Sequence, residues 1–153
     1  MDRKELIERL EKLERPDREI DCLIWAHFDG RTVRESDRFI LARSTRPPHD
    51  ECVLGTIDPG EYSRNFQCEG YHNPPVPAYT ASLDAAIALV EKMRPGWTWG
   101  AGTTDMEQHP FAAQVRQKGV ITSDHDYSFG PTPAIALLLA LLRFYGGRVD
   151  GTA

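Results

Sequence analysis

The sequence lacks the features that mark several classes of protein. Its most apolar stretch, residues 134–142 (AIALLLALL), has nine residues where a membrane-spanning helix needs about 20, so we expect a buried helix there and no membrane association. The first residues are charged, without an apolar signal segment, and the cysteines number only three, Cys22, Cys52 and Cys68. These features predict a protein of the bacterial cytosol with reduced thiols.

Local catalytic and nucleotide-binding signatures are also missing. The chain has no GxSxG, HExxH, GxxxxGK[ST] or GxGxxG, and Gly100-Ala101-Gly102 is an isolated fragment without the strand and helix that phosphate binding needs. No helix-turn-helix or zinc-finger pattern is present. Convergent active sites need no local motif, so an enzyme is not excluded, but the sequence favours a protein without catalytic activity.

Lysine is scarce, with 4 residues against 14 arginines. Arginine suits bidentate contact with carboxylates and phosphates, although a genome rich in G and C produces the same bias. The net charge of −5 argues against binding to a long nucleic acid. Residues 29–46 nevertheless carry a local net charge of +2, while the rest of the chain carries −7.

The order of helical and strand patterns predicts one α+β domain, residues 1–153, in which helices cover a largely antiparallel sheet. Leucine spacing predicts a helix over 2–15 that Pro16 ends, and Asp17 is placed to cap a second helix ending near Gly30. Short apolar runs at 39–42 and 52–57 predict a hairpin. Residues 58–78 contain repeated proline and glycine and predict a long surface loop.

The second half has clearer boundaries. Ser82 is placed to cap a helix over 83–93 that Pro95-Gly96 ends, and Thr132 caps a helix that begins at Pro133 and that Gly146-Gly147 stops after residue 145. Alternation predicts strands at 97–99 and 111–116 joined by a connection over 100–110, with a further short strand at 120–122. Trp97 and Trp99 are expected to pack in the core and sheet.

Three segments resemble a known family. The runs PAYTASLDAAIALV (77–90) with PGWTW (95–99), the opening around 6–11 and 16–21, and TPAIAL (132–137) are similar to the signature of the phage ABA-sandwich domain, found in small phage and prophage proteins. The resemblance implies an α/β/α sandwich and a phage or prophage origin. It implies no activity, because the family as a whole has no established function, and residues 31–75 depart from its pattern.

The candidate metal ligands form two pairs. His49 with Cys52, and Cys68 with His72, provide the four nitrogen and sulfur ligands of a tetrahedral structural zinc site. The alternative is that Cys52 lies in a strand with its side chain buried in the core, as free cysteines commonly do.

Arginines dominate the predicted hairpin and its approach. A pocket lined by some of them could hold a small phosphorylated ligand, with Tyr71 of the following loop stacking on a base. The alternative is a charged strand edge that prevents aggregation. The candidate binding residues are Arg31, Arg34, Arg38, Arg43, Arg46 and Tyr71.

A cluster of acids and histidines supports an alternative, catalytic interpretation. If two loops meet, these residues could bind a metal or perform acid–base hydrolysis, although turn chemistry explains part of the pattern equally well. The cluster comprises Asp105, Glu107, His109, Asp124, His125 and Asp126.

Taken together, the sequence predicts a phage accessory protein that binds a host protein or a small anionic, nucleotide-like ligand, for example in counter-defence. The metal-assisted hydrolase is one alternative. A structural homo-oligomer is another, because the closing helix is apolar around most of its circumference.

Overall fold

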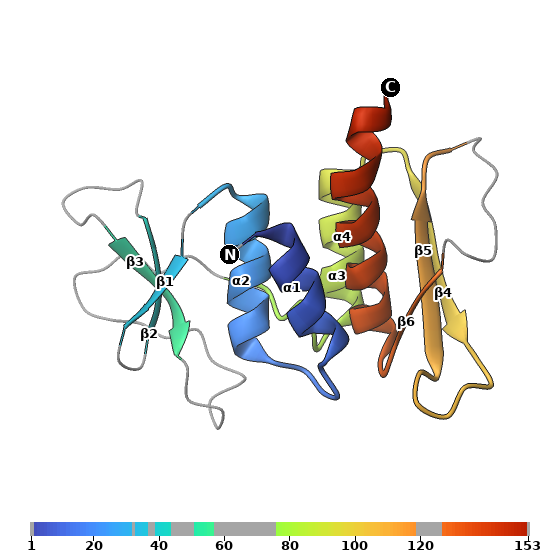
Figure 1. Cartoon of the computed structure of the whole chain (residues 1–153), viewed down its shortest axis with the longest axis horizontal. Coiled ribbons are helices and arrows are strands. Elements are labelled where there is room, and N and C mark those ends of the chain that lie inside the picture. The colour runs from blue at the N-terminus through green and yellow to red at the C-terminus, as the bar shows by residue number, and fades with distance from the viewer. Residues whose placement is uncertain are drawn as a thin grey trace.

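The computed structural model describes residues 2–31, 33–36, 39–43, 51–56, 76–118 and 127–152, and the side chains of 2–31, 33, 76–118 and 127–144. Helices occupy the middle of the molecule, between two three-stranded antiparallel sheets of order β1-β2-β3 and β4-β5-β6 (Figure 1). The predicted α+β class, with helices packed against an antiparallel sheet, is confirmed. The elements are α1 (Arg3–Glu11), α2 (Arg18–Phe28), β1 (Val33–Ser36), β2 (Phe39–Arg43), β3 (Glu51–Thr56), α3 (Leu83–Met93), β4 (Thr98–Thr103), β5 (Phe111–Arg116), β6 (Ser128–Gly130) and α4 (Pro133–Thr152).

Both N-terminal helices begin at aspartate caps. Asp2 and Glu5 form a capping box on α1, which ends at Glu11, earlier than the predicted 15. The side chain of Asp17 accepts hydrogen bonds from the backbone of the first turn of α2, as predicted. Gly30 follows the end of α2 and has a φ of 70°. A glycine adopts this left-handed conformation without steric cost.

The sheet β1-β2-β3 contains the predicted hairpin. Strands β2 and β3 pair antiparallel with an irregularity between Ile40 and Leu41, and β1, which the sequence analysis did not identify as a separate strand, pairs with β2 from Val33 to Ser36. This sheet packs against α2 through β2 and β3. It therefore stands at the opposite end of the molecule from β4-β5-β6 (Figure 1).

Helix α3 has the predicted bounds and cap. The hydroxyl of Ser82 accepts a hydrogen bond from the amide of Ala85 (3.1 Å), and Gly96, with φ 80°, lies in the turn that follows the helix. The buried residues of this helix are Ala86, Leu89 and Val90.

Strand β4 is longer than predicted. It pairs with β5 without a break from Thr98 opposite Arg116 to Thr103 opposite Phe111, so residues 100–103, expected in the connection, belong to the strand. Trp97 packs against the core, and Trp99 lies in the sheet on the edge strand β4, where it is 37% exposed. Strand β6 was not predicted, and residues 120–122 lie outside the described residues.

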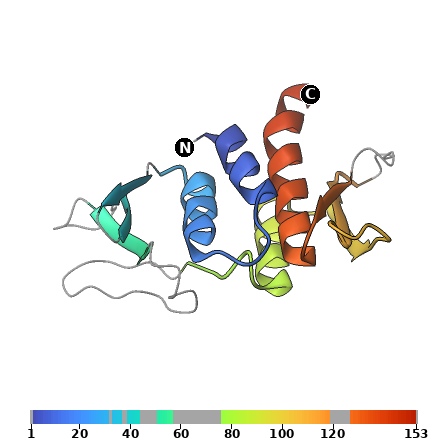
Figure 2. The same ribbon diagram turned by 60° about the horizontal axis from the view of Figure 1, so that its bottom comes forward.

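Helix α4 is the centre of the core. Every residue from Ala134 to Leu142 is at most 3% exposed, because α4 contacts α1, α3 and the sheet β4-β5-β6 (Figure 2). This segment is covered within one chain, so its apolar surface no longer argues for a homo-oligomer. The helix continues through Gly146-Gly147 to Thr152, and the predicted stop after residue 145 is wrong.

Candidate functional site

Of the candidate binding residues, Arg31 alone has a side chain that the structure describes. Arg31, after α2, lies over the ring of Trp25 at 4.8 Å and pairs with Asp29. Arg34 lies on β1 opposite Leu41, and Arg43 on β2 opposite Glu51; their side chains are outside the described residues. Arg38, Arg46 and Tyr71 also lie outside them. The anion pocket predicted on these residues stays a prediction.

The zinc ligands are likewise beyond what the structure describes. Cys52 lies on β3 opposite Ala42, and its side chain is outside the described residues, as are His49, Cys68 and His72. Within the described ranges, no group of three or more His, Cys, Asp or Glu side chains is placed to hold a metal. Cys22 is a fully buried thiol whose pKa burial raises to about 12.

The structure describes only some residues of the acid and histidine cluster. Asp105, Glu107 and His109 lie in the connection between β4 and β5, whereas Asp124, His125 and Asp126 lie outside the described residues. Thr104 organises this connection: its amide donates to the carbonyl of Pro110 (2.7 Å) and its hydroxyl to that of His109 (2.6 Å). These two bonds use backbone carbonyls and not the side chains of Asp105, Glu107 or His109, so the catalytic interpretation of the cluster stays a prediction.

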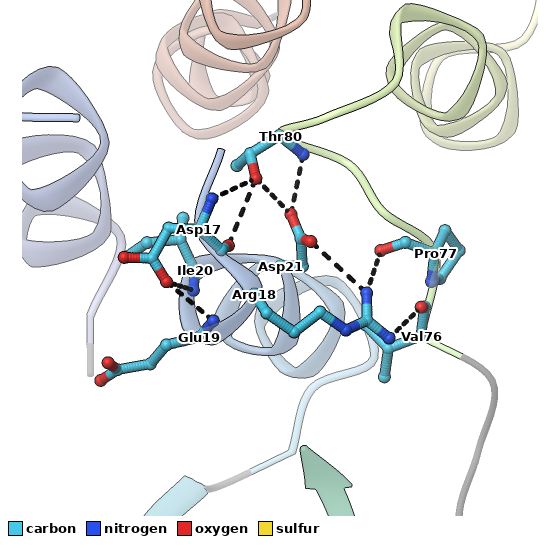
Figure 3. Close-up of polar contacts among 8 residues, drawn as sticks. All are labelled: Asp17, Arg18, Glu19, Ile20, Asp21, Val76, Pro77 and Thr80. Atoms are coloured by element: carbon cyan, nitrogen blue, oxygen red, sulfur yellow. Dashed lines mark hydrogen bonds and ion pairs between the residues drawn. The ribbon is translucent and has the colours of Figure 1, made fainter. Parts of the chain in front are cut away.

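A buried polar network joins α2 to the segment that leads into α3 (Figure 3). The carboxylate of Asp21, fully buried, accepts hydrogen bonds from the backbone amide (2.7 Å) and the hydroxyl (2.8 Å) of Thr80. The guanidinium of Arg18 lies 3.4 Å from the same carboxylate and donates to the carbonyls of Val76 and Pro77. The amide of Asp17 donates to the Thr80 hydroxyl (2.9 Å).

Desolvation dominates the electrostatics of this network. Burial raises the pKa of Asp21 to about 6, although the hydrogen bonds from Thr80 and the charge of Arg18 act in the opposite direction. All the contacts of these side chains described above are with helix α2 itself or with residues 76–80. Because Arg18 is 7% exposed and Asp21 is fully buried, the arrangement joins two segments inside the protein.

Sequence reasoning missed this network. The sequence signal for it was the pair Arg18 and Asp21, which are three residues apart and so lie on one face of the helix that Asp17 caps. The same spacing is equally typical of an ion pair exposed to solvent. The partner, Thr80, is 59 residues further along the chain from Asp21, so no local pattern reveals the contact.

The second feature is a hollow on the outer face of β4-β5-β6, away from the helices. In β5, Ala113 and Val115 are buried toward α4, so Ala112 and Gln114 face outward. Their register partners Gly102 and Gly100 in β4 lie on the same outer face. The hollow measures about 570 Å³ and is lined by Gly100, Ala101, Gly102, Thr103, Ala112, Gln114, Tyr127 and Phe129.

Two aromatic side chains border a floor made of small residues. Phe129, 38% exposed, stands beside Ala112, and Tyr127, 37% exposed, accepts a hydrogen bond from the Gln114 amide (3.1 Å). A Cβ added at Gly100 or Gly102 would meet nothing within 4 Å. Part of a ligand could therefore approach the backbone of β4 directly, with the two exposed rings on the other side of β5.

Neither aromatic was singled out from the sequence. Tyr127 directly precedes the unpredicted strand β6 and Phe129 lies in it, and their exposure depends on which face of the sheet α4 covers. Alternation along β5 was a usable signal, because it separates Ala113 and Val115 from the outward-facing Ala112 and Gln114.

Comparisons with known proteins add no relative. No protein-family model, no curated protein and no solved structure matches the chain. Among the helices within the described ranges, none is both long and apolar enough to cross a membrane.

Proposed function

We propose that this chain is a binding protein without catalytic activity, and that the outer face of β4-β5-β6 is its contact surface. The observation that carries the proposal is the pair of exposed aromatic rings, Tyr127 and Phe129, beside a glycine floor in a hollow of about 570 Å³. Ligand sites are typically concave and mostly apolar, with a few placed polar groups. Each of the two large rings is more than a third exposed, so a partner that covered them would gain free energy by burying apolar surface.

The position of the most perturbed carboxylate supports binding over hydrolysis. A general acid or base has to reach its substrate, and Asp21 is fully buried against Thr80 and Arg18. Its raised pKa therefore reflects burial inside the protein. The metal-assisted hydrolase remains an alternative whose residues Asp124, His125 and Asp126 lie outside the described residues.

The biological setting of the proposal is a phage or prophage accessory protein acting in the bacterial cytosol. This part rests on the resemblance of residues 77–90, 95–99 and 132–137 to the phage ABA-sandwich signature. The buried network gives that signature a physical reason, because Thr80 of one signature segment binds Asp21 of another. Contacts of this kind stabilise the fold, so a signature that includes them constrains the interior and not the contact surface.

Native mass spectrometry of untagged protein purified from its host tests the proposal. We expect an additional bound mass on the unchanged protein and on Met106→Ala, a control at an exposed residue outside the hollow. Phe129→Ala and Gly102→Val, which remove a ring and fill the floor, should lack that mass. Absence of any bound mass, or its retention by both hollow variants, would contradict the proposal.

A further inference from the structure

Basic residues follow the hollow at one end of β5, and acidic residues lie in the connection at the other end. On β5, Arg116 follows Gln114 on the same outer face, about 7 Å further along the strand. Lys118 follows two residues later, whereas Asp105 and Glu107 lie in the connection at the opposite end of β4 and β5. A ligand with one anionic group would consequently orient that group toward Arg116.

The side chain of Arg116 is held in position for such a contact. Its Nε donates to the hydroxyl of Thr98, its register partner on β4, at 3.1 Å. This bond uses Nε, and the two terminal nitrogens are separate donors of the same planar group. Paired guanidinium nitrogens match two phosphate oxygens, which makes arginine well suited to recognise a phosphate group.

The aromatic end suits a planar ring. Nucleobases stack on exposed aromatic side chains of antiparallel sheets, and Phe129 and Tyr127 offer such faces beside a floor without Cβ atoms. The amide of Gln114 adds a polar group at the centre of the hollow. A three-stranded sheet is about 10 Å across, which accommodates one nucleotide better than a strand of several.

We infer that the hollow binds a mononucleotide, with its base on the Gly100–Gly102 floor against Phe129 and Tyr127 and its phosphate on Arg116. The inference rests on the proposed function and names its ligand class. It places the anion-binding role on Arg116, which is separate from the arginines of residues 31–46. The acidic chain, with a net charge of −5, is consistent with a local anion site and not with a long nucleic acid.

Calorimetric titration at low salt with the four ribonucleoside monophosphates tests the inference. We expect at least one to bind with a dissociation constant up to about 1 mM. Phe129→Ala should weaken that binding by about tenfold or more, because base stacking is lost, and Gly102→Val should abolish it. Arg116→Gln should weaken nucleotide binding by about tenfold while leaving the affinity for the matching nucleoside unchanged.

Controls separate the contributions of base and phosphate. Met106→Ala should bind like the unchanged protein, and inorganic phosphate and ribose 5-phosphate should bind much more weakly than the nucleotide. Equal binding of phosphate alone, or no effect of Phe129→Ala, would overturn the inference.

The outcomes also distinguish the inference from the proposed function. If no mononucleotide binds but a protein partner is found on the unchanged protein and lost from both hollow variants, the ligand class is wrong and the contact surface is right. If neither a nucleotide nor any other mass depends on the hollow, both are wrong.

Discussion

The interior and the outer sheet face of this protein distribute polarity in opposite ways. Arg18, Asp21 and Thr80 place a charged and polar network within the helical layer, whereas Phe129 and Tyr127 expose apolar rings on the sheet. Each is unfavourable by itself, since burying charge and exposing aromatic surface both cost free energy. The interior network is compensated within the chain by Thr80 and by the carbonyls of residues 76–77, while the rings have no comparable cover among the described residues. This difference separates a structural joint from a binding surface.

The largest effect on stability is expected from removing the buried guanidinium of Arg18. Arg18→Ala should lower the free energy of unfolding by about 3–5 kcal/mol, because Asp21 and the carbonyls of Val76 and Pro77 lose their donor inside the protein. Denaturant unfolding measures the change. The matched control is Arg9→Ala, whose ion pair with Glu19 is partly exposed and should contribute about 0–1 kcal/mol. Equal losses in the two variants would show that the interior network has no special role.

The next effect is a pH dependence caused by Asp21. Its pKa is about 6 in the folded protein, against 3.8 for an aspartate exposed to water in an unfolded chain, so the folded state binds the proton more tightly. The stability that Asp21 contributes is present below pH about 3.8 and is lost as the pH rises through about 6, a change of about 3 kcal/mol. Asp21→Asn should remove this step from a plot of unfolding free energy against pH. An unaltered pH profile in the variant would assign the step to other groups.

A smaller effect should follow removal of one hydroxyl. Thr80→Val keeps the shape of the side chain and the backbone amide that binds Asp21, but leaves the carboxylate without its hydroxyl donor. We expect a loss of about 1–3 kcal/mol in thermal or denaturant unfolding. Thr103→Val, at an exposed position on β4, is the control and should change stability little. A neutral Thr80→Val would mean that the backbone amide of Thr80 and the contacts of Arg18 are sufficient to join the two segments.

The smallest effect on stability should come from the outer face. Phe129→Ala should change the free energy of unfolding by about 1 kcal/mol or less, because the residue is 38% exposed and lies on the outer face of the sheet, outside the core. Paired with the loss of ligand expected from the same variant, this result would separate binding from folding. A loss of several kcal/mol would instead show that Phe129 stabilises the fold, and would contradict its assignment to the binding surface.

Local chemistry predicted many of the element boundaries. Asp17, Ser82 and Thr132 cap helices where their side chains predict caps, and alternation located strand β5. Those signals act within one turn of helix or along one strand, so sequence alone carries them.

Errors arose where packing outweighed local preference. Gly100 and Gly102 predict a connection, yet both pair in β4 because the neighbouring strand β5 provides a continuous register. Gly146-Gly147 predicts a helix end, but each glycine costs only about 1 kcal/mol in a helix, and α4 continues through them. The candidate sites at 31–75 and 124–126 remain predictions.

The sequence by itself determined the helix caps, the α+β class and the buried apolar helix over residues 134–142, because each follows from periodicity and neighbouring side chains. Only the tertiary structure decided that Asp21 meets Thr80 and that α4 covers one face of β4-β5-β6. Both depend on contacts between residues far apart in the chain. That choice of face leaves Phe129 and Tyr127 exposed, and it is the reason the candidate binding surface could not be found in the sequence.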